Sequence, residues 1–109
     1  MAQSVTTATE SENGKAVNIR AGDILEVRLH ENATTGYRWA LDAVDSPLVK
    51  VHEAQYSSPS SSVGGSGEVT WRIEARAPGS LEIKLKLWRS WEGEKSIQKR
   101  FGITLTIGA

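Results

Sequence analysis

The side chains that could carry out catalysis are few in this chain and are not grouped as catalysis requires. The 109 residues contain no Cys, which excludes a thiol nucleophile, a thiolate zinc site and a disulfide. The two histidines, His30 and His52, occupy polar positions of extended segments, and neither has a second ligand at a spacing typical of metal sites. We therefore expect no metal and no cofactor.

Ser66 and the acidic pair Glu92 and Glu94 are the remaining candidates for catalysis. Ser66 lies in the segment GGSGE, which lacks the last Gly of a nucleophile elbow and opens no helix. No Lys follows these glycines, so they do not form a phosphate-binding loop. Glu92 and Glu94 lie in a turn beside Trp91, where we expect solvated carboxylates. The sequence predicts a protein that is not an enzyme.

Three segments instead carry residues that are typical of recognition. They are Asn32 to Trp39 (NATTGYRW), Val63 to Gly67 (VGGSG) and Leu87 to Gly93 (LWRSWEG). In the first, Asn and Thr side chains can bond to nearby backbone and Gly36 permits a positive φ, so we expect a compact turn. The third brings Trp88, Arg89 and Trp91 to a loop, and Trp and Arg dominate the hot spots of protein interfaces.

The elements that must position these segments have the pattern of β-strands. From Lys15 onward apolar residues alternate with polar ones, and no stretch has a sustained helical period. The clearest apolar sets are Leu25, Val27 and Leu29; Val69, Trp71, Ile73 and Ala75; Leu81, Ile83, Leu85 and Leu87; and Phe101, Ile103, Leu105 and Ile107. The sequence predicts an all-β fold, an immunoglobulin-like antiparallel β-sandwich of about seven strands without a disulfide.

An antiparallel order assigns each connection to one of two ends of the sandwich. Tight turns at Ala21 to Asp23, Asp45 to Pro47 and Ala77 to Ser80 then gather at one end. Longer loops at 31–36, 57–67 and 90–95 gather at the other end, where such folds place recognition. We expect the end with the longer loops to bind a partner.

The four Trp residues are an unusual share of the seven aromatic residues in this chain. Trp39 and Trp71 are in phase with apolar neighbours, which predicts that both are in the core. Trp91 follows the last buried position and is expected to take part in recognition. Trp88 falls on the polar phase, and it either packs over Lys and Arg stems on the sheet face or joins the binding surface.

Thirteen basic and thirteen acidic residues leave no net charge, which argues against a dedicated binder of nucleic acid or anionic membrane. The neutral surface also indicates that electrostatic steering is not the main source of affinity. Residues 1–13 are polar and have no signal-peptide pattern, so we expect a flexible arm followed by one domain at 14–109. We expect a monomer that is periplasmic or secreted, its signal peptide already removed.

Taken together, the three segments resemble the chagasin family of cysteine-protease inhibitors. The family's loops carry an N-P-T-T-G-[YF]-x-W motif, a glycine motif of the type G-x-G-G and an R-P-W motif. The resemblance covers about Gly14 to Ile107, and the motifs occur in the expected order. It implies an immunoglobulin-like sandwich that wedges three loops into the active-site cleft of papain-like cysteine proteases, such as papain or a cathepsin L-like enzyme.

The resemblance also implies roles for single residues. Those of the first loop would sit over the catalytic Cys, those of the second would enter the unprimed side of the cleft, and those of the third would brace the primed side, with Trp91 near the enzyme's catalytic His. The protease-binding residues are then Asn32, Thr34, Thr35 and Gly36; Gly64, Gly65 and Gly67; and Arg89 and Trp91.

The chain departs from the family motifs at two positions of the outer loops. Ala33 and Ser90 stand where the family has Pro, and the glycine motif is permuted to GGSG. Because each Pro would restrain φ, each loop is expected to lose about 0.4–1 kcal/mol of preorganisation.

Two other functions fit part of the sequence. An adhesion or carbohydrate-binding module could use Trp88 and Trp91 as a sugar platform, although it would have no need of Thr34, Thr35 and the glycine loop. A structural domain of a larger assembly is the third possibility. Trp88 and Trp91 alone do not separate these hypotheses, whereas Thr34, Thr35 and Gly36 together with the glycine loop favour the inhibitor.

Overall fold

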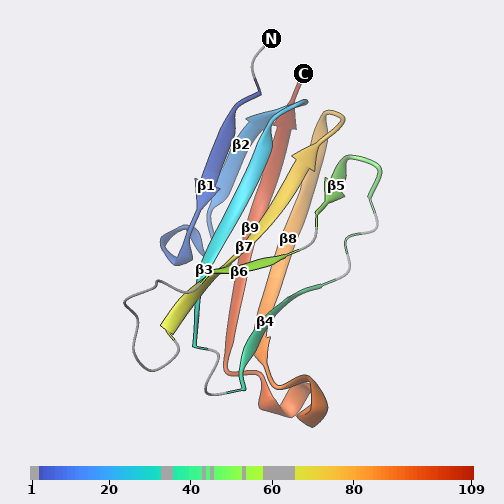
Figure 1. Cartoon of the computed structure of the whole chain (residues 1–109). Helices are drawn as coiled ribbons and strands as arrows, with labels where there is room; N and C mark the ends of the chain where they lie inside the picture. Colours follow the sequence, from blue (N-terminus) through green and yellow to red (C-terminus); the bar gives the residue numbers. More distant parts are fainter. Residues whose placement is uncertain (1–2, 33–35, 43, 45, 53, 58–65) are drawn as a thin grey trace.

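The computed structural model of this chain describes residues 3–32, 36–42, 44, 46–52, 54–57 and 66–109. These residues form nine strands in two sheets, with three short 3-10 turns (Figure 1). The first sheet contains β1 (Val5–Ala8), β3 (Ile24–Asn32), β7 (Ser66–Ala75), β5 (Val49–Val51) and β6 (Gln55–Ser57). The second contains β2 (Ala16–Arg20), β9 (Lys99–Gly108), β8 (Gly79–Trp88) and β4 (Arg38–Leu41). The predicted all-β sandwich is confirmed.

Two long antiparallel pairs form the centre of the sheets. In the first sheet β3 pairs with β7, and in the second β8 pairs with β9. The prediction that all strands are antiparallel is wrong, because β1 pairs with β3, and β2 with β9, in parallel. Two short strands, β5 and β6, lie between Leu48 and Ser57 and pair with different parts of β7. The alternating pattern could not reveal these pairings, since they depend on contacts between distant segments.

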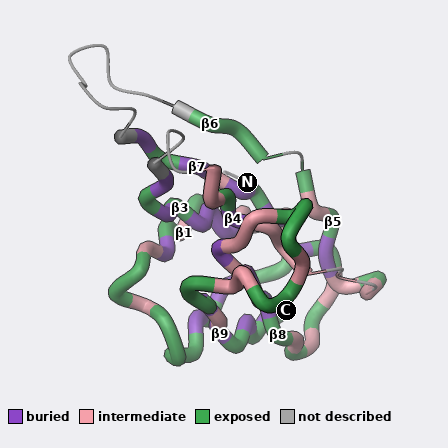
Figure 2. Tube along the Cα trace, turned by 90° about the horizontal axis from the view of Figure 1, so that it is seen from below, coloured by how far each residue is buried: buried purple, intermediate pink, exposed green. Residues whose placement is uncertain are grey.

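The core lies between the sheets and is made of the apolar residues that alternate along the strands. Leu25, Leu29, Ile73, Ile83 and Leu105 are among its fully buried side chains. Trp39 and Trp71 are buried as predicted. Figure 2 shows the same alternation of buried and exposed residues along the tube of the chain. Apolar burial of this kind is the main driving force for folding.

The segment near the N-terminus corrects the expectation of a flexible arm. Val5–Ala8 form β1 against β3, and Ala8 is fully buried. A 3-10 turn, η1 (Glu10–Glu12), follows, in which the Glu12 carboxylate accepts from the Thr9 backbone N–H at 2.8 Å and from the Ser11 hydroxyl at 2.7 Å. A strand of four residues offers too short an alternation to be recognised in the sequence.

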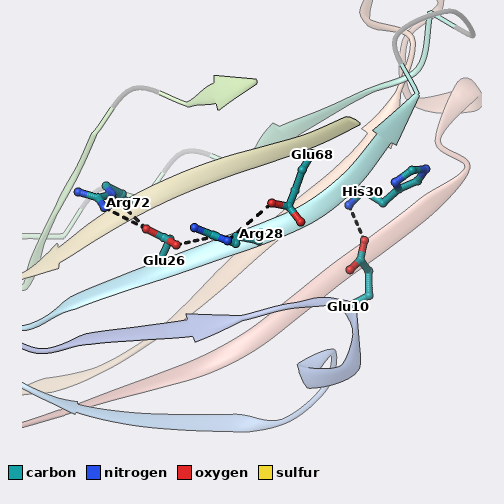
Figure 3. A network of polar contacts seen from close by, with 6 residues as sticks. All are labelled: Glu10, Glu26, Arg28, His30, Glu68 and Arg72. Carbon is teal, nitrogen blue, oxygen red and sulfur yellow. Dashed lines mark hydrogen bonds and ion pairs between the residues drawn. The ribbon is translucent and has the colours of Figure 1, made fainter. Parts of the chain in front are cut away.

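The outer face of the first sheet carries a chain of ion pairs (Figure 3). Glu26 is buried and lies between two arginines, 2.6 Å from Arg28 Nε and 3.1 Å from Arg72 Nη2. Arg28 also reaches Glu68 at 3.8 Å. The buried carboxylate is thus compensated by both arginines, as a buried charge requires.

Strand pairing brings the two kinds of connection to opposite ends. Where β3 ends, Asn32 is opposite Ser66 of β7, and where β8 ends, Trp88 is opposite Arg38 of β4. The described strand ends that flank residues 33–37 (the first loop), 58–65 (the second loop) and 89–98 (the third loop) therefore lie at one end, which we call the loop end. At the other end, the turn end, the Gly22 N–H donates to the carbonyl of Ala75 at 2.8 Å.

Among the described residues, no helix is long and apolar enough to cross a membrane.

Candidate functional site

Gly36 of the first loop and Trp91 of the third loop are packed against each other at the loop end. Gly36 has φ +80°, and a Cβ added there would lie 3.0 Å from Trp91 Cη2. The Trp91 side chain nevertheless stays 70% exposed, more than any other large apolar residue among those described. Glycine therefore permits both the left-handed turn and the close approach of the indole ring, and the result is an exposed aromatic surface.

Arg89 connects the same two loops through its guanidinium group. Its Cζ lies 4.4 Å from the centre of the Tyr37 ring, and its Nη1 lies 3.3 Å from Glu92 Oε2. Arg89 Nε would be 3.6 Å from a Cβ at Gly36. Stacking on an aromatic ring and pairing with a carboxylate hold a guanidinium in a defined orientation. The first and third loops thus form one contact unit.

Ser96 holds the third loop in its compact shape. This loop contains two 3-10 turns, η3 (Ser90–Glu92) and η4 (Glu94–Ser96). The Ser96 hydroxyl accepts from the Arg89 backbone N–H at 3.0 Å and lies 2.7 Å from the carbonyl of Gly93. Gly93 has φ +77° and lies between the turns. These bonds place Arg89 and Trp91 at a defined position relative to the end of β8.

Glu31 fixes the start of the first loop to the second sheet. Its side chain is 4% exposed, and its Oε1 accepts from the Trp39 backbone N–H at 2.7 Å. The Trp39 indole N–H in turn donates to the carbonyl of His30 at 2.9 Å. Since Glu31 and His30 belong to β3 and Trp39 to β4, these two bonds join the sheets on both sides of the first loop.

The structure brings together three of the residues predicted to bind a protease: Gly36, Arg89 and Trp91. Gly67 is buried within β7, opposite Glu31, and so belongs to the sheet rather than to the loop in which it was expected. Asn32 is the last residue of β3, and only its backbone is described. Thr34, Thr35, Gly64 and Gly65, together with Ala33, lie outside the described residues.

Sequence reasoning missed three residues that position the site: Glu31, Tyr37 and Ser96. Glu31 could have been noticed, because it continues the inward phase of Leu25, Val27 and Leu29 and is a carboxylate in an apolar row. Tyr37 is part of the first predicted segment, Asn32 to Trp39, but nothing in that motif indicates that its ring would hold Arg89. Nothing in the sequence around Ser96 indicates that its hydroxyl would bond back to Arg89.

Trp88 packs on the sheet face, which was one of its two predicted roles. Its side chain is partly buried, and Lys86 Nζ lies 3.9 Å from the centre of its ring. The ammonium group therefore occupies one face of the indole.

A groove of about 490 Å³ opens at the same end of the molecule. Its apolar lining includes Trp39, Leu87 and Phe101, and its polar lining includes His30 and Lys99. Among the described residues, no group of three or more His, Asp or Glu side chains could hold a metal ion. Among the described residues, Trp91 is the most exposed large apolar residue at this end.

Comparison with known protein families places the chain in one of them. The model of the chagasin family of peptidase inhibitors, I42, matches residues 18–105. The chain belongs to this family. The members are inhibitors of peptidases and not enzymes. The matched residues include the whole of the loop end, with both the Gly36–Trp91 contact and the Ser96 bonds.

Two known proteins are similar to this chain over most of its length. Chagasin of Trypanosoma cruzi is 26% identical over 102 residues, which cover 89% of this chain and 93% of the relative. Amoebiasin-1 of Entamoeba histolytica is 29% identical over 83 residues, covering 76% of this chain and 81% of the relative.

Solved structures share the fold across nearly the whole chain. The cysteine protease inhibitor EhICP2 of Entamoeba histolytica has a TM-score of 0.84 and 22% identity, covering 96% of both chains. PbICP-C, solved in complex with falcipain-2, has a TM-score of 0.64 and 20% identity, covering 96% of this chain and 91% of its own. At these identities the likeness shows the fold, an immunoglobulin-like sandwich.

Proposed function

We propose that this protein is a reversible inhibitor of papain-like cysteine proteases, and that its loop end covers the catalytic cleft. The observation that carries the proposal is the contact unit of the first and third loops, in which exposed Trp91 rests on Gly36 and Arg89 is held by Tyr37 and Glu92. A large aromatic side chain held rigidly at a loop tip is a typical hot spot of a protein interface. It suits insertion into a cleft of the partner.

The mechanism needs no chemistry in the inhibitor. A papain-type enzyme holds a thiolate of low pKa beside an imidazolium. A rigid wedge over this pair excludes substrate, and it escapes cleavage as long as no carbonyl of the wedge is presented in attack geometry. Rigidity also raises affinity, because fewer side chains and loops must be ordered on binding. Glu31 and Ser96 supply that rigidity at the bases of the first and third loops.

Within this proposal each predicted residue has a role. Asn32, Thr34, Thr35 and Gly36 would cover the catalytic Cys, Gly64 and Gly65 would enter the unprimed side, and Arg89 and Trp91 would brace the primed side. Gly67 lies within β7 and would act indirectly, by anchoring the second loop to the sheet. The family membership supports peptidase inhibition, and the names of EhICP2 and of the PbICP-C complex support cysteine proteases as the targets.

A carbohydrate-binding module is less well supported. A sugar platform needs the open face of an aromatic ring, but Lys86 covers one face of Trp88. No observation at the loop end favours sugar over protein.

The test is a titration of papain and a cathepsin L-like enzyme with the purified chain, followed by the hydrolysis of a fluorogenic peptide. We expect inhibition that is reversed on dilution and leaves the chain uncut. Trypsin, which uses a serine nucleophile, is the control and should stay active. No inhibition of either cysteine protease at about 10 μM of the chain would refute the proposal.

A further inference from the structure

The outer face of the second sheet carries four cations and one Trp side chain, in a group that begins where the first and third loops end. Its members alternate with the buried residues of β4, β8 and β9 and therefore point away from the core. We call them the basic strip: Arg38, Lys84, Lys86, Trp88 and Arg100.

The register of the sheet sets these residues side by side. Arg38 is opposite Trp88, and Lys86 is opposite Arg100 on the other neighbouring strand. Cross-strand neighbours have Cβ atoms about 4.5–5.5 Å apart. The strip is continuous with the loop end, because Arg38 directly follows Tyr37 and Trp88 directly precedes Arg89.

Only part of this charge is neutralised within the molecule. Lys86 lies 3.5 Å from Asp42, and Lys84 lies 3.3 Å from Glu82. Arg38 and Arg100 are exposed, and neither has an ion pair among the described residues. The outer face of the first sheet differs, since Arg28 and Arg72 are both committed to Glu26. The zero net charge of the chain therefore conceals a local positive field.

Trp88 gives the basic strip an ordered apolar centre. Its ring is partly buried and lies under Lys86 Nζ, which is itself held by Asp42. An aromatic ring flanked by arginines matches the composition of protein interfaces, in which Trp and Arg are enriched and Lys is depleted. Arg38 and Arg100, which have no ion pair within the part of the chain that the structure describes, lie on either side of Trp88 and Lys86 and would meet a partner surface that carries carboxylates.

We propose that the basic strip is a second contact surface for the target protease, which docks on acidic residues at the rim of the catalytic cleft beside the third loop. The proposal rests on the proposed function and specifies the chemistry of the partner. It also revises the expectation that steering contributes little. Complementary charge at the rim of an interface mainly raises the association rate, and salt screens the effect.

The experiment compares Arg100→Glu and Arg38→Glu with a matched control, Arg20→Glu. Arg20 is exposed on β2 of the same sheet, but it lies toward the turn end and has no ion pair among the described residues. The association rate is measured from inhibition progress curves between about 20 and 500 mM salt. One target is a papain-like enzyme with an acidic cleft rim, and the second is a papain-like enzyme with a basic one.

For the acidic target, we expect wild-type association to slow about tenfold over this salt range. Arg100→Glu and Arg38→Glu should each slow association about three- to tenfold at low salt and flatten the salt dependence, whereas Arg20→Glu should change it less than about twofold. For the basic target, neither reversal should slow association. Circular dichroism and the melting temperature verify that each variant is folded.

Equal effects of Arg100→Glu and Arg20→Glu would overturn the proposal, because only net charge would then matter. A rate that does not depend on salt would also overturn it. In both cases inhibition by the wild-type chain would remain, so the proposed function would stand. If the wild-type chain inhibits neither enzyme, both the proposed function and the proposed role of the basic strip are refuted.

Discussion

Gly36 at the loop end and Gly79 at the turn end meet the same steric demand with opposite consequences. Both have a positive φ, +80° and +153°, and both have a side chain where a Cβ would stand. At Gly36 that side chain is Trp91, which stays 70% exposed. At Gly79 it is Leu48, which packs against the core. A glycine with positive φ therefore lets a large side chain pack closely at both ends. At the loop end that side chain stays exposed, and at the turn end it packs against the core.

This difference separates binding from stability. Substitutions at the loop end should weaken inhibition and leave the free energy of unfolding unchanged. Substitutions at the turn end should lower the free energy of unfolding and leave inhibition unchanged. Five experiments follow, in order of decreasing expected effect.

Trp91→Ala should have the largest effect, and the effect should be on inhibition alone. We expect the inhibition constant to rise by about 2 kcal/mol or more, roughly 30-fold, because an aromatic anchor is lost. Since the side chain is exposed, the free energy of unfolding should change by less than about 0.5 kcal/mol. An unchanged inhibition constant against papain would remove Trp91 from the site.

Gly79→Ala should destabilise the fold without changing inhibition. A Cβ would lie 2.6 Å from Leu48 Cδ1, at a φ that favours glycine, so we expect a loss of about 2 kcal/mol in urea denaturation. Gly22→Ala is the control, because Gly22 has φ +96° at the same end and open space around it. If the control loses as much stability, the backbone and not the contact with Leu48 is responsible.

Gly36→Ala should weaken inhibition by about 1 kcal/mol, roughly fivefold, since the new Cβ would displace Trp91 from its place. The matched control is Gly93→Ala in the third loop, where φ is +77° and nothing lies within 4 Å of the Cβ. Equal losses in inhibition for both variants would assign the effect to backbone strain in the loops and contradict the role of the Gly36–Trp91 contact.

Ser90→Pro should tighten inhibition by about 0.4–1 kcal/mol, roughly two- to fivefold. Ser90 is the first residue of η3, where a helical turn has no use for the backbone N–H. The preceding Arg89 is already extended, with φ −102° and ψ 109°, as a residue before Pro must be. Weaker inhibition by this variant would show that the third loop must rearrange on binding.

The smallest effect is expected from Glu12, which lies in η1 and makes the stability of the fold depend on pH. Hydrogen bonds from Ser11 and from the Thr9 backbone lower the pKa of this exposed carboxyl below its ordinary value. The unfolded chain then binds the proton more readily, so stability rises with pH in that range and is lost as pH falls below about 4.3. Glu12→Gln should flatten urea denaturation midpoints between pH 3 and 5, and should leave inhibition at neutral pH unchanged.

Much of the fold was predictable because alternation reports burial directly. The inward sets around Leu25, Ile73, Ile83 and Leu105 are the core, and Trp39 and Trp71 are in it. The parallel pairing of β1 and the division between β5 and β6 were not predictable. Both depend on which strand edges remain free once the long pairs have formed.

The sequence predicted which residues form the candidate site, but not the contacts that hold them in place. Motif order along the chain singled out Gly36, Arg89 and Trp91, and the sandwich brought them together. The supporting bonds of Glu31, Tyr37 and Ser96 escaped prediction, because each joins residues that are separated along the chain or depends on the exact path of a loop.

The sequence by itself determined the strand pattern, the absence of cysteine, and which residues could serve as anchors, since these follow from residue type and period. Only the tertiary structure decided that Trp91 rests on Gly36 and that Gly67 belongs to a strand. It also decided that Arg28 and Arg72 of one face are paired, while Arg38 and Arg100 of the other have no ion pair among the residues that the structure describes. The physical reason is that packing contacts and charge neutralisation depend on distances across strands, and the register of the sheets sets those distances.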